Sequence, residues 1–119
     1  MRAVKVLLVS LNESARAWMR SALGPPWEFC EASHGLEALD VASDEEPDLV
    51  IADESTEPYG AFGLARELKT MTPPPRVIVL LDRAQDSWLA RWSGADAWLV
   101  QPVDVFALAE AARTPQPAV

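Results

Sequence analysis

Three short apolar runs without polar alternation constrain the fold of this chain more than any other feature. They occupy residues 4–10 ("VKVLLVS"), 48–53 ("DLVIAD") and 76–81 ("RVIVLL"). Unbroken valine, isoleucine and leucine are typical of strands covered on both faces, whereas a strand with one wet face alternates apolar and polar residues. The runs therefore predict a parallel sheet buried between layers of helices.

The intervening segments complete an alternating order of strands and helices. Further strands are expected at residues 27–32 and 97–100, and helical spacing of apolar residues appears at 13–23, 33–43, 61–71, 85–93 and 104–113. In the second helix we place Leu36, Leu39 and Ala42 on the inward stripe. Because a helix makes every crossover, we expect an α/β fold with a three-layer, doubly wound, five-stranded parallel sheet. One domain should cover residues 1–113, with residues 114–119 as a tail or the start of a linker.

Composition excludes several classes of protein. The chain of 119 residues is half hydrophobic, enough for one buried core, and no apolar run approaches a membrane span. The start, "MRAVKVLLVS", lacks the cleavage site of a secretory signal, and a single cysteine, Cys30, suits a reducing cytoplasm. A net charge of −8 argues against nucleic acid as a ligand of this domain. We therefore expect a cytoplasmic protein with no membrane or nucleic-acid partner.

The ends of the predicted strands are the places to look for a site, because doubly wound sheets bind ligands beyond their carboxyl ends. These ends carry Ser10 and Leu11, Asp53, Leu81, and Gln101. Asp53 could be a solvated strand end, a metal ligand or a nucleophile. No nucleophile–base pair, paired carboxylates or metal-ligand cluster accompanies it in the sequence, so we do not expect an enzyme.

Five motifs follow one another along the chain: "VKVLLV", "ASHGLEAL", "PDLVIAD", "PRVIVLL" and "GADAWLVQP". On these motifs nearly the whole chain resembles the receiver domain of bacterial two-component response regulators, the CheY-like family, and "PDLVIAD" and "GADAWLVQP" are the specific parts. The resemblance implies a flavodoxin-like sheet with strand order 2-1-3-4-5 and Asp53 at the position of the phosphoacceptor aspartate. It also implies a cis peptide bond between Gln101 and Pro102.

The chain departs from this family at every other position that carries its chemistry. The acidic pair that holds Mg²⁺ aligns with Ser10 and Leu11. The hydroxyl residue that binds the phosphoryl oxygen aligns with Leu81, and the lysine that cancels phosphoryl charge aligns with Gln101. Phosphoryl transfer to a carboxylate depends on neutralising charge, and Mg²⁺ depends on carboxylate ligands. We therefore expect no cofactor, a degenerate pocket without Mg²⁺, and a vestigial acid at Asp53.

The aromatic residues suggest an interaction surface. Trp88 and Trp92 lie four residues apart on the fourth helix, and Trp98, at the position of the family's switch aromatic, lies on the fifth strand. We place Trp88 in the core and leave Trp92 open between core and interface. Tyr59, in the loop after the third strand, is a further candidate contact. The family's usual partner face, made by the fourth helix, fifth strand and fifth helix, would carry Trp92 and Trp98.

Three hypotheses follow for function. The first is an atypical, degenerate receiver that acts by protein–protein contact, as a docking or dimerisation module independent of phosphorylation. The second keeps Asp53 as a live phosphoacceptor. The third is a receiver that senses a small molecule, because removing charged groups leaves a more apolar crevice at the strand ends.

Overall fold

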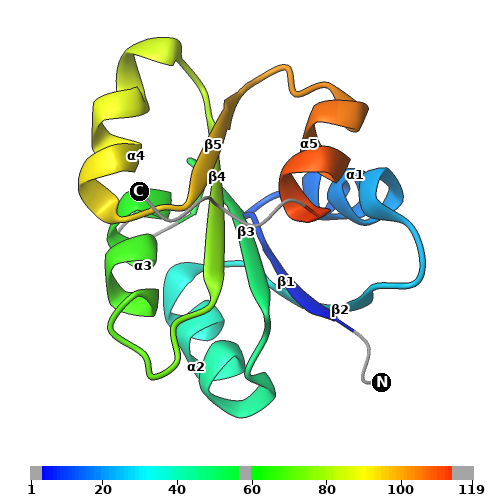
Figure 1. Cartoon of the computed structure of the whole chain (residues 1–119), viewed down its shortest axis with the longest axis vertical. Coiled ribbons are helices and arrows are strands. Elements are labelled where there is room, and N and C mark those ends of the chain that lie inside the picture. Colours follow the sequence, from blue (N-terminus) through cyan, green and yellow to red (C-terminus); the bar gives the residue numbers. More distant parts are fainter. Residues whose placement is uncertain (1–3, 57–59, 114–119) are drawn as a thin grey trace.

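The computed structural model describes residues 4–56 and 60–113, and in it a parallel sheet lies between two layers of helices (Figure 1). The strands are β1 (Lys5–Val9), β2 (Glu28–Ala32), β3 (Leu49–Asp53), β4 (Arg76–Leu81) and β5 (Ala97–Val100). Their order in the sheet is β2-β1-β3-β4-β5, and all neighbours are parallel. The predicted fold class and strand order are confirmed.

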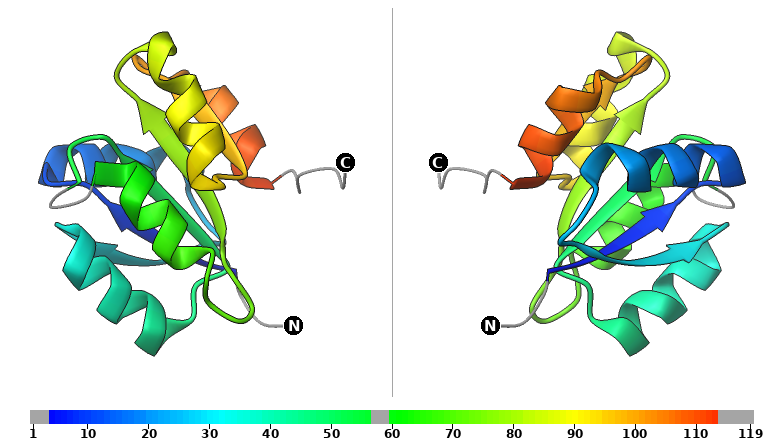
Figure 2. Two further views of the ribbon diagram at one scale, coloured as in Figure 1. Left: turned by 90° about the vertical axis from the view of Figure 1, so that its left-hand side faces the viewer. Right: turned by 90° about the vertical axis from the view of Figure 1, so that its right-hand side faces the viewer.

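The helices cover both faces of the sheet. They are α1 (Glu13–Leu23), α2 (Gly35–Glu45), α3 (Gly60–Leu68), α4 (Ser87–Ser93) and α5 (Val105–Arg113), with a 3₁₀ turn, η1 (Ala84–Asp86), before α4. Figure 2 shows α2, α3 and α4 on one face and α1 with α5 on the other. The predicted bounds of α1, β4 and β5 agree with the structure, and other ends differ by a few residues. The predicted tail at 114–119 lies outside the described residues.

Capping residues set several helix ends where the sequence predicts them. The backbone N–H of Ser14 donates to Asn12 Oδ1 at 2.9 Å and starts α1, and the N–H of Ala107 donates to Asp104 Oδ2 at 3.0 Å and starts α5. Gly24 ends α1 with φ of 61° and Gly94 ends α4 with φ of 84°, a backbone region that glycine adopts without steric cost.

The core has two halves, one on each face of the sheet. Alternate strand residues point to opposite faces, so Leu7, Val50, Val79 and Leu81 pack beneath α2, α3 and α4. Their neighbours along the same strands pack beneath α1 and α5; these are Val6, Leu8, Ile51, Ile78 and Leu80. The three central strands are therefore buried on both faces, which explains why their apolar runs are unbroken.

Two predicted core positions are wrong. Leu36 is 51% exposed, because α2 begins at Gly35 and turns Gly35, Ala38 and Ala42 inward instead. Trp88 is 63% exposed, because α4 turns Ala90 and Ser93 inward and Trp88, two residues before Ala90, lies on the opposite side of the helix. Across the described ranges, no helix is both long and apolar enough to span a bilayer.

Candidate functional site at the carboxyl end of the sheet

Four strand ends build the candidate site. Ser10 follows β1, Asp53 ends β3, Leu81 ends β4, and Gln101 follows β5. Because β1, β3, β4 and β5 are parallel neighbours, these residues meet at one edge of the sheet. Ser10 is fully buried and Asp53 is 6% exposed, so the carboxylate lies just beneath the surface.

The carboxylate of Asp53 is held by serine donors. Ser10 Oγ donates to Oδ2 at 2.8 Å, and Ser55 donates to Oδ1 through its hydroxyl at 2.5 Å and its backbone N–H at 3.1 Å. Burial of a carboxylate is costly unless hydrogen bonds satisfy its oxygens. These three donors satisfy both oxygens, and within residues 4–56 and 60–113 no cationic side chain forms an ion pair with Asp53.

The same two hydroxyls connect the loops after β1 and β3. The backbone N–H of Leu11 donates to Ser55 Oγ at 3.0 Å, and that of Asn12 donates to Ser10 Oγ at 3.1 Å. Sequence reasoning missed Ser55. Its position two residues after Asp53 is the signal that could have found it, because an aspartate often accepts a hydrogen bond from the backbone two residues on.

The two leucines expected in the degenerate pocket lie at the strand ends, but their side chains point elsewhere. Leu11 contributes only its backbone N–H, and its side chain is 57% exposed. Leu81 is fully buried in the core half beneath α2, α3 and α4. Ser10 therefore contacts Asp53 as a pocket residue would, whereas Leu11 and Leu81 do not close over it.

A cavity of about 230 Å³ adjoins Asp53 on the side of α1. Its apolar walls come from Trp18, Met19 and Val103, and its polar groups belong to Asp53 and Gln101. The peptide bond between Gln101 and Pro102 at its rim is cis, as predicted from the family resemblance. Of the degenerate-pocket residues, Gln101 alone lines this cavity.

A second network of polar groups joins the ends of β3, β4 and β5. The backbone N–H of Asp82 donates to Glu54 Oε2 at 2.6 Å, and Gln101 Nε2 donates to Asp82 Oδ1 at 3.2 Å. The Gln101 amide is therefore engaged with the loop after β4. Glu54 turns away from Asp53, as the alternation of a strand predicts.

The carboxyls of this network have shifted pKa values. Burial raises the pKa of Glu54, with further upward contributions from its hydrogen bond to Asp86 and from the charges of Asp86 and Asp82, while the Asp82 N–H opposes them. The hydrogen bond from Arg83, at 3.0 Å, is the main reason that the pKa of Asp86 is lowered.

Arg16 of α1 contacts the loop after β1 and is already paired. Arg16 Nη1 donates to the backbone oxygen of Ser10 at 2.6 Å, and its Nε donates to Glu31 Oε1 at 2.8 Å. Glu31 also pairs with Arg20 on the next turn of α1. Arg16 therefore fixes the backbone of Ser10, and its charge is balanced by Glu31.

The aromatic candidates lie on α4 and β5, away from Asp53. Trp92 is 55% exposed, and Trp98 is partly buried against the core. Arg66 of α3 lies over the Trp92 ring with Cζ 4.2 Å from its centroid, and Arg91 lies over Trp98 at 5.8 Å. Tyr59 falls outside the described residues.

The chain is similar in sequence to known proteins. No family model matches the chain. It is 32% identical over 114 residues to the uncharacterized response regulatory protein Rv3143 of Mycobacterium tuberculosis strain ATCC 25618 / H37Rv, a match that covers 89% of this chain and 86% of that protein. The uncharacterized response regulatory protein MT3230 of strain CDC 1551 / Oshkosh matches with the same identity and coverage.

Solved structures share the fold at lower identity. The chemotaxis response regulator CheY4 of Vibrio cholerae has a TM-score of 0.85 and 22% identity, over 94% of this chain and 98% of that one. A putative response regulator from Chloroflexus aurantiacus has a TM-score of 0.87 and 18% identity, over 94% and 96%. At these identities the matches show the CheY-like, flavodoxin-like fold alone.

Proposed function

Because the chain belongs to the response regulator family and is a receiver domain of two-component signalling, we propose that it is an atypical receiver. It acts as a docking module for other proteins and does so without phosphorylation of Asp53. The observation that carries this proposal is the set of hydrogen bonds from Ser10 and Ser55 that hold the buried Asp53 carboxylate. A carboxylate satisfied by neutral hydroxyls needs no cation to be stable in the folded chain.

The residues around Asp53 do not fit the Mg²⁺ that the family resemblance implies. Mg²⁺ prefers octahedral oxygen ligands and is usually held by one or two carboxylates. Here the positions of the acidic pair carry the hydroxyl of Ser10, already committed to Asp53, and the solvent-facing isobutyl group of Leu11. Within the parts of the chain that the structure describes, no three His, Cys, Asp or Glu side chains form a group that could hold a metal.

The positions that would receive a phosphoryl group are also changed. The developing charge of phosphoryl transfer requires fixed cations and donors. Gln101 carries no charge, and its amide donates to Asp82. The side chain of Leu81 has no hydrogen-bond donor and is fully buried. An acyl phosphate at Asp53 would therefore lie beside the hydroxyls of Ser10 and Ser55, and no lysine or arginine among residues 4–56 and 60–113 forms an ion pair with Asp53 that could balance its charge.

The hydrogen bonds at the strand ends support a receiver held in one state. Ser10 to Asp53, Asp82 to Glu54 and Gln101 to Asp82 join the ends of β1, β3, β4 and β5 without a phosphoryl group. Such a domain can present a constant surface to a partner, whose binding is then controlled by concentration or by the partner itself.

Intact-mass spectrometry after incubation with acetyl phosphate and Mg²⁺ tests this proposal. We expect the wild-type mass to be unchanged. A receiver domain that carries both the acidic pair and the phosphoacceptor aspartate is the positive control. A phosphate adduct that is absent from the Asp53→Ala variant would refute the proposal and restore Asp53 as an acceptor.

Small-molecule sensing is the second candidate, and the cavity of about 230 Å³ beside Asp53 and Trp18 favours it. Pockets for drug-sized ligands usually hold about 300 Å³ or more, so only a small ligand would fit. A thermal-shift screen of small polar metabolites tests this candidate, with a Trp18→Ala variant as control. A hit that Trp18→Ala abolishes would support sensing, and the absence of any hit would count against it.

A further inference from the structure

The face of the sheet that carries α2, α3 and α4 differs in charge from one side to the other. Helix α3 lies between α2 and α4 and packs against both, as the left view of Figure 2 shows. The charged side chains exposed on α2 are acidic, whereas the charged side chain exposed on α4 is Arg91 and the neighbouring helix α3 exposes Arg66 beside Glu67. Both α2 and α4 also expose apolar side chains.

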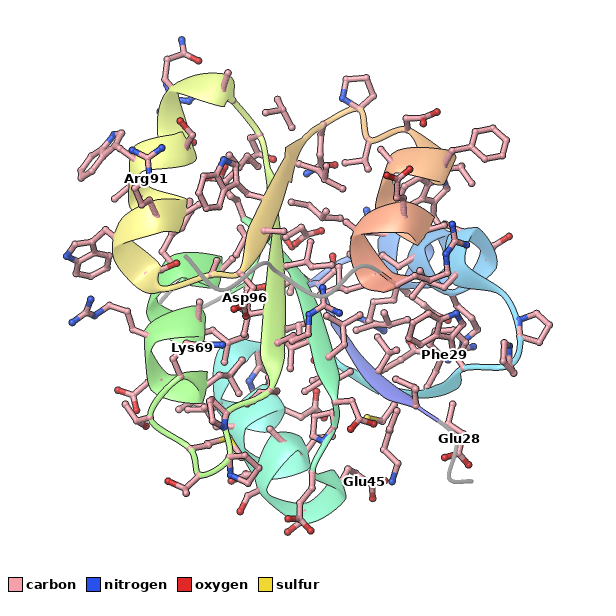
Figure 3. The ribbon with its side chains drawn as sticks, viewed as in Figure 1. Glu28, Phe29, Glu45, Lys69, Arg91 and Asp96 are labelled. Carbon is pink, nitrogen blue, oxygen red and sulfur yellow. The ribbon has the colours of Figure 1, made fainter. Side chains whose placement is uncertain are left out.

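The α4 side is aromatic and basic. Trp88 and Trp92 of α4 are both exposed. Arg91, which lies between them in sequence, is exposed as well and projects outward from α4 (Figure 3). Arg66 extends this side onto α3, where its guanidinium covers the Trp92 ring and its Nη1 donates to the Trp92 backbone oxygen at 3.0 Å. Neither Arg66 nor Arg91 forms an ion pair with any carboxylate in the described ranges.

The α2 side is acidic with one apolar residue. Leu36, Asp40 and Asp44 recur every four residues, so they form one stripe along the helix, and all three are exposed. Glu37 and Glu45 of the same helix are engaged, with Ser33 and Lys5 respectively. By contrast, Asp40 and Asp44 make no ion pair with the rest of the described chain.

From this arrangement we propose that two copies of the chain dock through the α2–α3–α4 face. A twofold axis through α3 places α4 of each copy against α2 of the other. Arg66 and Arg91 then meet the partner's Asp40 and Asp44, and Trp88 and Trp92 meet the partner's Leu36. A twofold interface uses the same patch on both copies and must be self-complementary, and this face carries both complementary halves.

Charge explains why the partner is a second copy and why this face is chosen. Two chains of net charge −8 repel each other over most of their surfaces. The α4 side concentrates exposed arginines without acidic partners, so it is a place where an acidic copy can approach. The inference rests on the proposed docking function and names its partner. The proposed surface differs from the family's usual partner face, because it uses α4 together with α2 and α3 and does not use α5.

Charge reversal tests the pairing. One variant carries Arg66→Glu and Arg91→Glu, and the other carries Asp40→Lys and Asp44→Lys. In each variant alone, both contacts of the twofold dimer would join like charges. In an equimolar mixture of the two variants, both contacts would join opposite charges. Exposed residues of α5, on the other face of the sheet, supply the matched controls Arg113→Glu and Glu110→Lys.

Sedimentation equilibrium at low salt measures the result. We expect the wild type and both controls to dimerise, each charge-reversed variant to dimerise about tenfold or more weakly, and their mixture to recover heterodimers. Wild-type association should also weaken in 1 M salt, where the screening length is about 3 Å. A monomeric wild type, a dimer indifferent to both reversals, or a mixture that fails to associate would each overturn the inference.

The twofold dimer and the phosphorylation-independent docking function can be refuted independently of each other. A wild type that stays monomeric and takes no phosphate from acetyl phosphate overturns the twofold dimer but leaves phosphorylation-independent docking to another protein in place. A charge-dependent dimer that does take phosphate on Asp53 supports the interface and refutes the proposed function.

Discussion

Ser10 Oγ donates a hydrogen bond of 2.8 Å to Asp53 Oδ2, so the end of β1 satisfies the acid at the end of β3 instead of repelling it. In the family that the chain resembles, an acidic residue at the position of Ser10 would need a cation between the two carboxylates. A hydroxyl removes that need. Serine in place of the family's acidic residue at position 10 therefore changes the site from one that needs a metal between two carboxylates to one in which hydrogen bonds satisfy the Asp53 carboxylate.

Replacing Ser10 with alanine should destabilise the fold by about 1–3 kcal/mol, because the buried Asp53 carboxylate loses a donor and the backbone N–H of Asn12 loses its acceptor. Chemical denaturation of the two proteins measures the difference. The exposed Ser21→Ala on α1 is the matched control, with an expected change within about 0.5 kcal/mol. Equal effects of the two substitutions would show that the Ser10–Asp53 hydrogen bond contributes nothing to stability.

The contribution of Glu54 to stability should fall as the pH rises above 4.5, the ordinary pKa of glutamate, through its raised folded-state pKa. Within this window the folded chain keeps the Glu54 proton while the unfolded chain has lost it, so raising the pH favours unfolding. Asp86 acts in the opposite sense: its lowered pKa contributes stability above its ordinary value of 3.8, and that stability is lost at lower pH.

A Glu54→Gln variant isolates the contribution of Glu54. The amide oxygen can still accept from the Asp82 N–H, but nothing titrates, so the variant should be more stable than the wild type near neutrality. The free energy of unfolding, measured between pH 4.5 and neutrality, should then lose part of its slope. Exposed Glu110→Gln on α5 is the control, and a slope unchanged by Glu54→Gln would contradict the assignment.

Two ion pairs on the surface should differ in how much they stabilise the fold. Lys69 Nζ lies 2.8 Å from Asp96 Oδ2 (Figure 3), and the same oxygen accepts from the N–H of buried Val77 at 2.7 Å. Asp96→Ala leaves that N–H unsatisfied and should cost about 1–3 kcal/mol. Glu45→Ala breaks only the exposed pair with Lys5, at 3.0 Å, and should cost less than about 1 kcal/mol. Thermal and chemical denaturation compare them, and the reverse ranking would contradict this account.

The Trp88→Ala substitution should weaken dimerisation while leaving the stability of the fold nearly unchanged. The side chain is 63% exposed, so its loss should change the free energy of unfolding by no more than about 0.5 kcal/mol. As an aromatic anchor of the proposed twofold interface, it should weaken dimerisation by about tenfold or more. Sedimentation equilibrium and denaturation on the same samples measure both. Phe106→Ala, an exposed aromatic on α5, is the control and should leave dimerisation unchanged.

The fold could be predicted from the sequence because its strands are apolar on both faces and its helix ends are marked by caps. Residues 76–81 and 13–23 have the expected bounds for these reasons. The errors at Leu36 and Trp88 have a common cause. Both lie in the first turn of a helix whose inward side is lined by small residues, and helical spacing alone does not show which stripe packs closely enough to be buried.

The candidate site could be predicted in part. The position of Asp53 and the contact with Ser10 follow from strand order, because β1 and β3 are parallel neighbours. The contribution of Ser55 is signalled only by its position two residues after Asp53. The contribution of Asp82 depends on the path of the loop after β4, which neither spacing nor composition determines. The outward turn of Leu11 likewise follows from the loop that Ser55 holds through the Leu11 N–H.

The most direct test restores the missing cation and its ligands. Intact-mass spectrometry with acetyl phosphate and Mg²⁺ should compare the wild type with a Ser10→Asp/Leu11→Asp/Gln101→Lys variant and with the same variant carrying Asp53→Ala. We predict a phosphate adduct on the restored variant, none on the wild type, and none once Asp53 is removed. An adduct on the wild type that needs Asp53 would contradict the claim that hydroxyls and an uncharged amide leave this acid unable to accept a phosphoryl group.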